Sequence, residues 1–116
     1  MQGLAHVGDA VYELMIRTWL CKSGTSKAKN LHSKAVEYVS AKAQAAAAGK
    51  LLPALDEKEA AVYMRGRNTH INTVPKSSTY EEYHAATGVE ALFGFLYLSG
   101  KISRLNELFE LITEER

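Results

Sequence analysis

The sequence predicts an all-α fold in a single domain over residues 1–116. Apolar residues recur at helical spacing along the chain, and no segment alternates apolar and polar residues as a half-buried strand does. Ser, Thr and Asp stand at capping distance ahead of several of these segments. With 47% hydrophobic and 23% charged residues, the chain has the composition of a globular domain with one modest core.

The first half of the chain predicts three helices. The first spans residues 4–22 and ends at Ser23-Gly24. The second covers residues 29–38. Ser40 caps the third, which runs through an alanine-rich, strongly helix-forming segment as far as Pro53.

The second half predicts three more helices, of which the first follows a capping box. Asp56 and Glu59 have the capping-box spacing ahead of a helix over residues 57–67. Residues 68–78 then read as a loop, with Pro75 inside it.

The last two predicted helices are a long apolar one and a short amphipathic one. Thr79 and Glu82 have capping spacing and begin the apolar helix. A break is expected near Thr87-Gly88, and Gly100 ends the helix. Ser103 is expected to begin the final helix.

Glu90 is the one charge in the apolar stretch from Ala85 to Gly100. A buried carboxylate is costly, so it must become neutral, pair with a cation or bind a metal. Gly94 lies one turn later and permits a close approach on the same side of the helix. A purely structural Glu90, held by an arginine or by backbone groups, remains open.

The first helix carries a second candidate carboxylate, Asp9. A helical wheel places one narrow polar stripe on this helix: His6, Asp9, Glu13 and Arg17. The rest of the helix, including Leu14 and Trp19, is apolar or small and is expected to be mostly buried. Glu13 and Arg17 have the spacing of a structural ion pair.

Gly8 precedes Asp9 and costs helix stability, so it indicates that a helix, a metal or a backbone segment comes close there. If Asp9 and Glu90 converge across two packed helices, their oxygens suit Mg²⁺ or Mn²⁺. Two carboxylates far apart in the sequence do not establish such a site by themselves.

The charges are unevenly distributed along the chain. Residues 1–76 carry 11 Lys and Arg against 6 Asp and Glu, a net +5, whereas residues 77–116 carry 3 against 7, a net −4. The basic part could attract a polyanion, and an ordinary solvated surface explains it equally well.

Other classes of protein fit the sequence poorly. The four His and one Cys show no zinc spacing, and no phosphate-loop, dinucleotide or serine-hydrolase motif occurs. No apolar run reaches the ~20 residues of a membrane span, and the first residues do not read as a signal peptide. The lone Cys21 fits a reducing cytoplasm.

Five segments in a fixed order carry a family resemblance: LAHVGDAVYELMIR, LHSKAVEYVSAKAQA, EKEAAVYMRGRN, TVPK and TGVEALFGFLYL. Together they resemble Mini-ribonuclease III, the short branch of the ribonuclease III family, over nearly the whole chain. The resemblance implies an all-α endonuclease domain that acts as a homodimer on double-stranded RNA. It also implies divalent-metal sites in the dimer valley, 5′-phosphate products, and ribosomal RNA maturation in a bacterial cytoplasm, with a plastid less favoured.

The resemblance assigns roles to both carboxylates. Asp9 matches the Asp of the family's Gly-Asp signature, and Glu90 matches the Glu of its second carboxylate motif. Both are therefore expected to be catalytic and to bind Mg²⁺, with Mn²⁺ as a substitute. Ala5 and Thr87 stand where full-length relatives have further carboxylates, which implies more water or phosphate oxygen around the metal.

The resemblance also implies contacts to the RNA backbone from five residues: Arg65, Arg67, Asn68, Thr73 and Lys76. Because Arg65 and Arg67 lie on different helical faces, one can contact RNA while the other pairs internally. The atypical residues 69–72 bear on substrate preference rather than on the fold. Two alternatives stay open, a non-catalytic RNA-binding member of the family and a plain helical dimerisation module.

Overall fold

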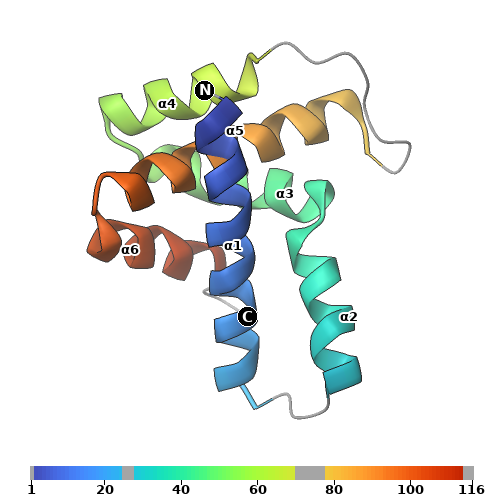
Figure 1. The fold of residues 1–116 in the computed structure, drawn as a ribbon. Coiled ribbons are helices and arrows are strands. Elements are labelled where there is room, and N and C mark those ends of the chain that lie inside the picture. The colour runs from blue at the N-terminus through green and yellow to red at the C-terminus, as the bar shows by residue number, and fades with distance from the viewer. Residues whose placement is uncertain (1, 25–27, 70–77, 114–116) are drawn as a thin grey trace.

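The computed structural model describes residues 2–24, 28–69 and 78–113, and every regular element in these ranges is helical (Figure 1). The all-α prediction is therefore confirmed. The elements are α1 (Gln2–Lys22), α2 (Ala28–Val39), α3 (Ala41–Leu51), a short 3₁₀ helix η1 (Leu52–Ala54), α4 (Glu57–Arg67), α5 (Tyr80–Leu98) and α6 (Ile102–Thr113). None of these helices has the length and apolar character that crossing a bilayer demands.

Three helices begin at the caps that the sequence predicts. The Ser40 side chain accepts a hydrogen bond from the Ala43 N–H at 3.1 Å at the start of α3. The Asp56 and Thr79 side chains cap α4 and α5, each in a complete capping box with the glutamate three residues later. These starts depend only on neighbouring residues, so the sequence locates them well.

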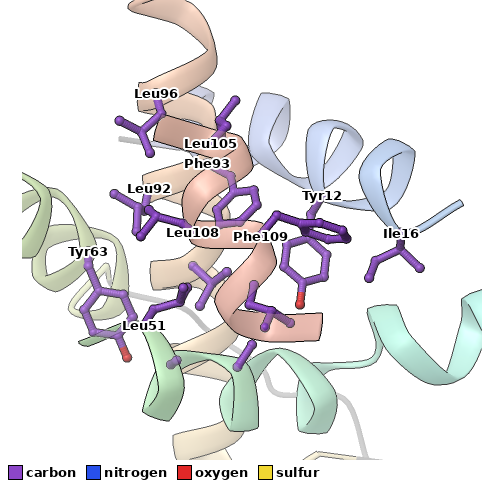
Figure 2. Close-up of a cluster of buried hydrophobic side chains, with 14 of the residues drawn as sticks. Tyr12, Ile16, Leu51, Tyr63, Leu92, Phe93, Leu96, Leu105, Leu108 and Phe109 are labelled. Carbon is purple, nitrogen blue, oxygen red and sulfur yellow. The ribbon is translucent and has the colours of Figure 1, made fainter. Parts of the chain in front are cut away.

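α5 is the central helix of the fold. α1, α3, α4 and α6 all pack against it, and Figure 1 shows α1 crossing it. The core gathers mainly where α1, α5 and α6 meet, and its side chains point toward one another in Figure 2. The Tyr12 ring lies against the Phe93 ring there, with ring centroids 5.2 Å apart.

α1 and α5 touch backbone to backbone at Gly8 and Gly94. A Cβ atom at Gly8 would lie 1.6 Å from the carbonyl oxygen of Glu90, and one at Gly94 would lie 2.0 Å from the carbonyl oxygen of Leu4. No side chain fits at either position. The sequence left open whether a helix, a metal or a backbone segment comes close to Gly8. The structure shows that it is the backbone of α5.

The predicted break in the long helix near Thr87-Gly88 is wrong, because α5 is continuous through it. A Cβ atom at Gly88 would lie 2.7 Å from a ring carbon of Tyr63, so this glycine makes room for α4. The Thr87 hydroxyl donates to the Tyr83 carbonyl oxygen at 3.0 Å, within the helix. Gly100, with φ of 74°, lies just beyond the end of α5, as expected.

Two smaller expectations also need correction. α6 begins at Ile102, because the Lys101 carbonyl oxygen accepts from the Leu105 N–H at 3.1 Å and Ser103 lies inside the helix. Leu14, expected to be buried, is 64% exposed. Most of the predicted loop, including Pro75, falls outside the described residues.

Substituting Gly8 tests the crossing of α1 and α5. Gly8→Ala should lower the free energy of unfolding by several kcal/mol, because its Cβ would overlap the Glu90 carbonyl and force the helices apart. Urea unfolding measures the change. Gly49→Ala is the matched control, because nothing lies within 4 Å of its added Cβ, and it should gain roughly 0.5–1 kcal/mol. Equal stability of the two variants would contradict the tight crossing.

Candidate active site

Asp9 and Glu90 line the same pocket, which has a volume of about 270 Å³. α1 supplies Asp9 and α5 supplies Glu90, while the end of α2 and the start of α3 form the opposite wall. The lining residues are Asp9, Val39, Ala41, Gln44, Tyr83, Ala86, Thr87 and Glu90. Two carboxylates from opposite ends of the sequence thus open into one space.

The crossing of α1 and α5 brings the two carboxylates together. Gly8 lies directly on the Glu90 backbone carbonyl, and Asp9 is the next residue of α1. Their side chains are close enough to interact, because the charge of Asp9 raises the pKa of Glu90. A backbone contact between the two helices thus places these two residues beside each other.

The surroundings of Glu90 disfavour its charged form. Burial, the charge of Asp9 and a hydrogen bond with Asp9 together raise the pKa of Glu90 to about 7, against an opposing hydrogen bond from Gln44. No Lys or Arg is among the pocket's described lining residues. The neighbouring Tyr12 hydroxyl also has a raised pKa, because of burial and the Glu90 charge. The described lining therefore brings two carboxyl groups together and includes no cation to compensate them.

Gln44 contacts Glu90 directly and was not singled out from the sequence. Its Nε2 donates to Glu90 Oε2 at 3.3 Å and to the Val39 carbonyl oxygen at 3.0 Å. The structure reveals it, because Gln44 begins the buried stripe of α3 that Ala47, Ala48 and Leu51 continue, a face that the alanine-rich sequence does not mark. It is the polar member of that stripe.

The pocket offers oxygen ligands of the kind that Mg²⁺ and Mn²⁺ prefer. Asp9 and Glu90 supply carboxylates, while the Thr87 hydroxyl, on the same wall, is engaged with the backbone. Among residues 2–24, 28–69 and 78–113, no three His, Cys, Asp or Glu side chains cluster as a ready metal cage. Two carboxylates in a polar pocket fit such an ion if water or substrate oxygens complete its coordination.

The polar stripe of α1 divides into two parts. Glu13 and Arg17 form the expected ion pair, with Arg17 Nε 2.8 Å from Glu13 Oε2. Both side chains are partly exposed, so the pair contributes little to stability. Neither residue lines the carboxylate pocket, which leaves Asp9 as the member of the stripe that does.

Three of the five predicted RNA-contacting residues, Arg65, Arg67 and Asn68, lie at the end of α4. Arg67 and Asn68 line a second pocket of about 240 Å³ with Thr69, Tyr80 and His84. His84 and Tyr80 come from the first turns of α5, the helix that carries Glu90 farther along. Both pockets therefore draw lining residues from α5. Thr73 and Lys76 lie outside the described residues.

Arg65 and Arg67 differ in their surroundings. Arg65 is exposed, whereas Arg67 is half-buried. Burial raises the pKa of Tyr63, and the charge of the Arg67 guanidinium, which interacts with this side chain, opposes the rise. The Arg67 carbonyl oxygen lies 2.7 Å from His84 Nδ1. Arg67 thus has an internal partner, whereas Arg65 is exposed and has no side-chain partner among the described residues.

Comparison with known proteins places the chain among nucleases. The family model described as the ribonuclease III domain matches residues 2–101. The Mini-ribonuclease 3 of Symbiobacterium thermophilum is 47% identical over 107 residues, covering 92% of this chain and 82% of that protein. The Mini-ribonuclease 3 of a Thermoanaerobacter species is 44% identical over 108 residues, covering 93% and 76%. A crystal structure of a Fusobacterium nucleatum protein superposes with a TM-score of 0.86 at 32% identity, covering 96% of this chain and 88% of that one.

Replacing Glu90 should stabilise the metal-free protein at alkaline pH. In the folded state the pKa of Glu90 is about 7, above its ordinary value of 4.5. The ionised carboxylate therefore lowers the free energy of unfolding. This loss is absent at low pH and grows as the pH rises from 4.5 to about 7. Glu90→Gln should therefore raise the free energy of unfolding by up to about 3 kcal/mol at pH 8, and by under about 1 kcal/mol at pH 5. Urea unfolding in EDTA measures both.

Glu110→Gln is the matched control for this measurement. It removes an exposed carboxylate from α6 and should change stability by less than about 0.5 kcal/mol at either pH. A Glu90→Gln protein that is less stable than the unaltered chain at pH 8 would show that the carboxylate is held favourably without a metal.

Proposed function

Because the chain belongs to the ribonuclease III family, it is an endoribonuclease, and we propose that it cleaves double-stranded RNA by metal-dependent hydrolysis at Asp9 and Glu90. One observation above all supports this proposal. Two acidic side chains from distant helices meet in one polar pocket that has no cationic lining residue among those described. A structural ion pair would instead have supplied the cation from the protein.

Each carboxylate has a separate task in this proposal. Asp9 is exposed at the pocket, where it can meet solvent and substrate, and Glu90 is more buried behind it. Together they would hold Mg²⁺, with Mn²⁺ as a substitute. When bound, the ion supplies positive charge for the scissile phosphate and lowers the pKa of water. The raised pKa of Glu90 reflects the energy that a bound cation would recover.

The basic and polar residues at the end of α4 and in the segment that follows it would position the RNA. A-form RNA is recognised largely through phosphates and 2′-hydroxyl groups, which suits Arg65, Arg67 and Asn68. Thr73 and Lys76 complete the proposed set from the segment outside the described residues. Since Arg67 already pairs with Tyr63, Arg65 is expected to carry the larger share of phosphate binding.

The proposed biological setting follows from the family. We infer a homodimer with two active sites, a ribosomal RNA precursor as substrate and a bacterial cytoplasm as location. The relatives named above are bacterial, which supports the last inference. Light scattering of the purified chain tests the dimer directly.

Cleavage of duplex RNA by the purified chain tests the catalytic proposal. Cutting should require Mg²⁺ and should stop when EDTA removes the metal. Asp9→Asn and Glu90→Gln should each lower the cleavage rate by at least about 100-fold while the helical content persists, because each removes a negatively charged ligand. Glu110→Gln, the exposed control on α6, should cut normally.

Full activity in both pocket variants would refute the proposed site. Metal-independent binding of duplex RNA without any cleavage would favour the non-catalytic RNA-binding alternative. A chain that neither binds nor cleaves RNA would favour a dimerisation module.

The salt dependence of RNA binding tests Arg65. Arg65→Ala should weaken duplex binding and reduce the slope of log K against log salt by about 1, because one phosphate contact is lost. Lys58→Ala, at the opposite end of the same helix, should leave the slope unchanged. Equal slopes for Arg65→Ala and the unaltered chain would exclude a phosphate contact from Arg65.

A further inference from the structure

Gln44 occupies an unusual place in the fold. Only 2% of its surface is exposed, and it lies on the inward stripe of α3 otherwise filled by Ala47, Ala48 and Leu51. A buried amide costs free energy unless its polar atoms are hydrogen-bonded. What those atoms contact therefore indicates what the residue does.

The amide nitrogen of Gln44 is held between two acceptors. It lies 3.0 Å from the carbonyl oxygen of Val39, at the end of α2, and 3.3 Å from Glu90 Oε2. The reverse orientation of the amide would place Gln44 Oε1 against both of these oxygens, so the orientation is fixed. The backbone of α2 thus anchors an amide that in turn contacts the Glu90 carboxylate.

The oxygen of the Gln44 amide lowers the stability of the folded protein. Gln44 Oε1 is buried and has no hydrogen-bond partner among the described residues. An unsatisfied acceptor of this kind costs on the order of 1–3 kcal/mol, which a methionine of similar length would avoid. Packing alone therefore does not account for a glutamine here, whereas its hydrogen bonds to the Val39 carbonyl and to Glu90 do.

We propose that Gln44 is a positioning residue that holds the Glu90 carboxylate toward Asp9, so that the pair is set for one divalent cation before RNA binds. This inference rests on the function proposed for Asp9 and Glu90. Residues that orient metal ligands in this way commonly change metal affinity by 10–100-fold. Gln44 itself need not touch the ion.

Metal binding without RNA tests the proposal. Mn²⁺ added to the full chain is counted by electron paramagnetic resonance, and thermal unfolding is followed separately in EDTA. Gln44→Met should raise the Mn²⁺ dissociation constant about tenfold, while the unfolding midpoint in EDTA stays the same or rises. Ala46→Met places the same side chain at an exposed position of α3 and should leave the affinity unchanged.

A dissociation constant within twofold of the unaltered chain would overturn the role of Gln44. So would a parallel loss of affinity and unfolding midpoint, because that pattern marks a packing residue. If the unaltered chain neither binds Mn²⁺ nor cleaves RNA, the proposed function itself fails. If the unaltered chain binds Mn²⁺ and cleaves RNA, and Gln44→Met binds Mn²⁺ equally well, only the positioning role of Gln44 fails.

A double-mutant cycle shows whether Gln44 acts through Glu90. Glu90→Asp keeps a carboxylate but withdraws it from the amide, so Gln44→Met should cost no further affinity in that background. Additive losses would overturn the coupling. Should Gln44→Met not fold, the side-chain amide resonances of Gln44 still decide: Glu90→Asp must shift them, and unchanged resonances would overturn the contact.

Discussion

The backbone contact between α1 and α5 is the constraint on which the rest of the structure depends. Gly8 and Gly94 let the two helices approach until their backbones touch, and Asp9 and Glu90 flank that contact. α5 is also the helix against which α3, α4 and α6 pack. A wider crossing would therefore loosen the core and separate the two carboxylates at once.

The carboxylate pocket lowers the stability of the folded protein but leaves two carboxylates available to bind a cation. A carboxylate that is buried beside another one raises the free energy of the folded state, as the raised pKa of Glu90 indicates. A partner cation from the protein would remove this cost, as Arg104 does for the buried Glu59 at 2.8 Å. The fold thus neutralises one buried glutamate and leaves the other available, which is how a binding site differs from a structural ion pair.

Features set by neighbouring residues could be predicted from the sequence, and features set by packing could not. The caps at Ser40, Asp56 and Thr79 depend on residues three positions away, and all three are present. The break expected at Gly88 is absent, because the reason for that glycine is Tyr63, on another helix.

The same distinction applies to the candidate site. Glu90 and Asp9 stood out because a charge in an apolar helix and a glycine beside a carboxylate can be recognised from the sequence alone. Gln44 did not stand out, since an alanine-rich segment conceals which face is buried. The internal partner of Arg67, Tyr63, is on the same helix, yet only the packed structure shows which of the two arginines is so engaged.

The wide separation of Asp9 and Glu90 along the sequence has a consequence for synthesis of the chain. The ribosome releases α1 first and α5 only after four other elements have emerged, at roughly 5–20 residues per second. Until α5 is released, Asp9 lacks Glu90 as a neighbour and the pocket lacks the wall that α5 forms. A nascent chain of this protein therefore carries no assembled acidic pair until α5 has emerged and packed against α1.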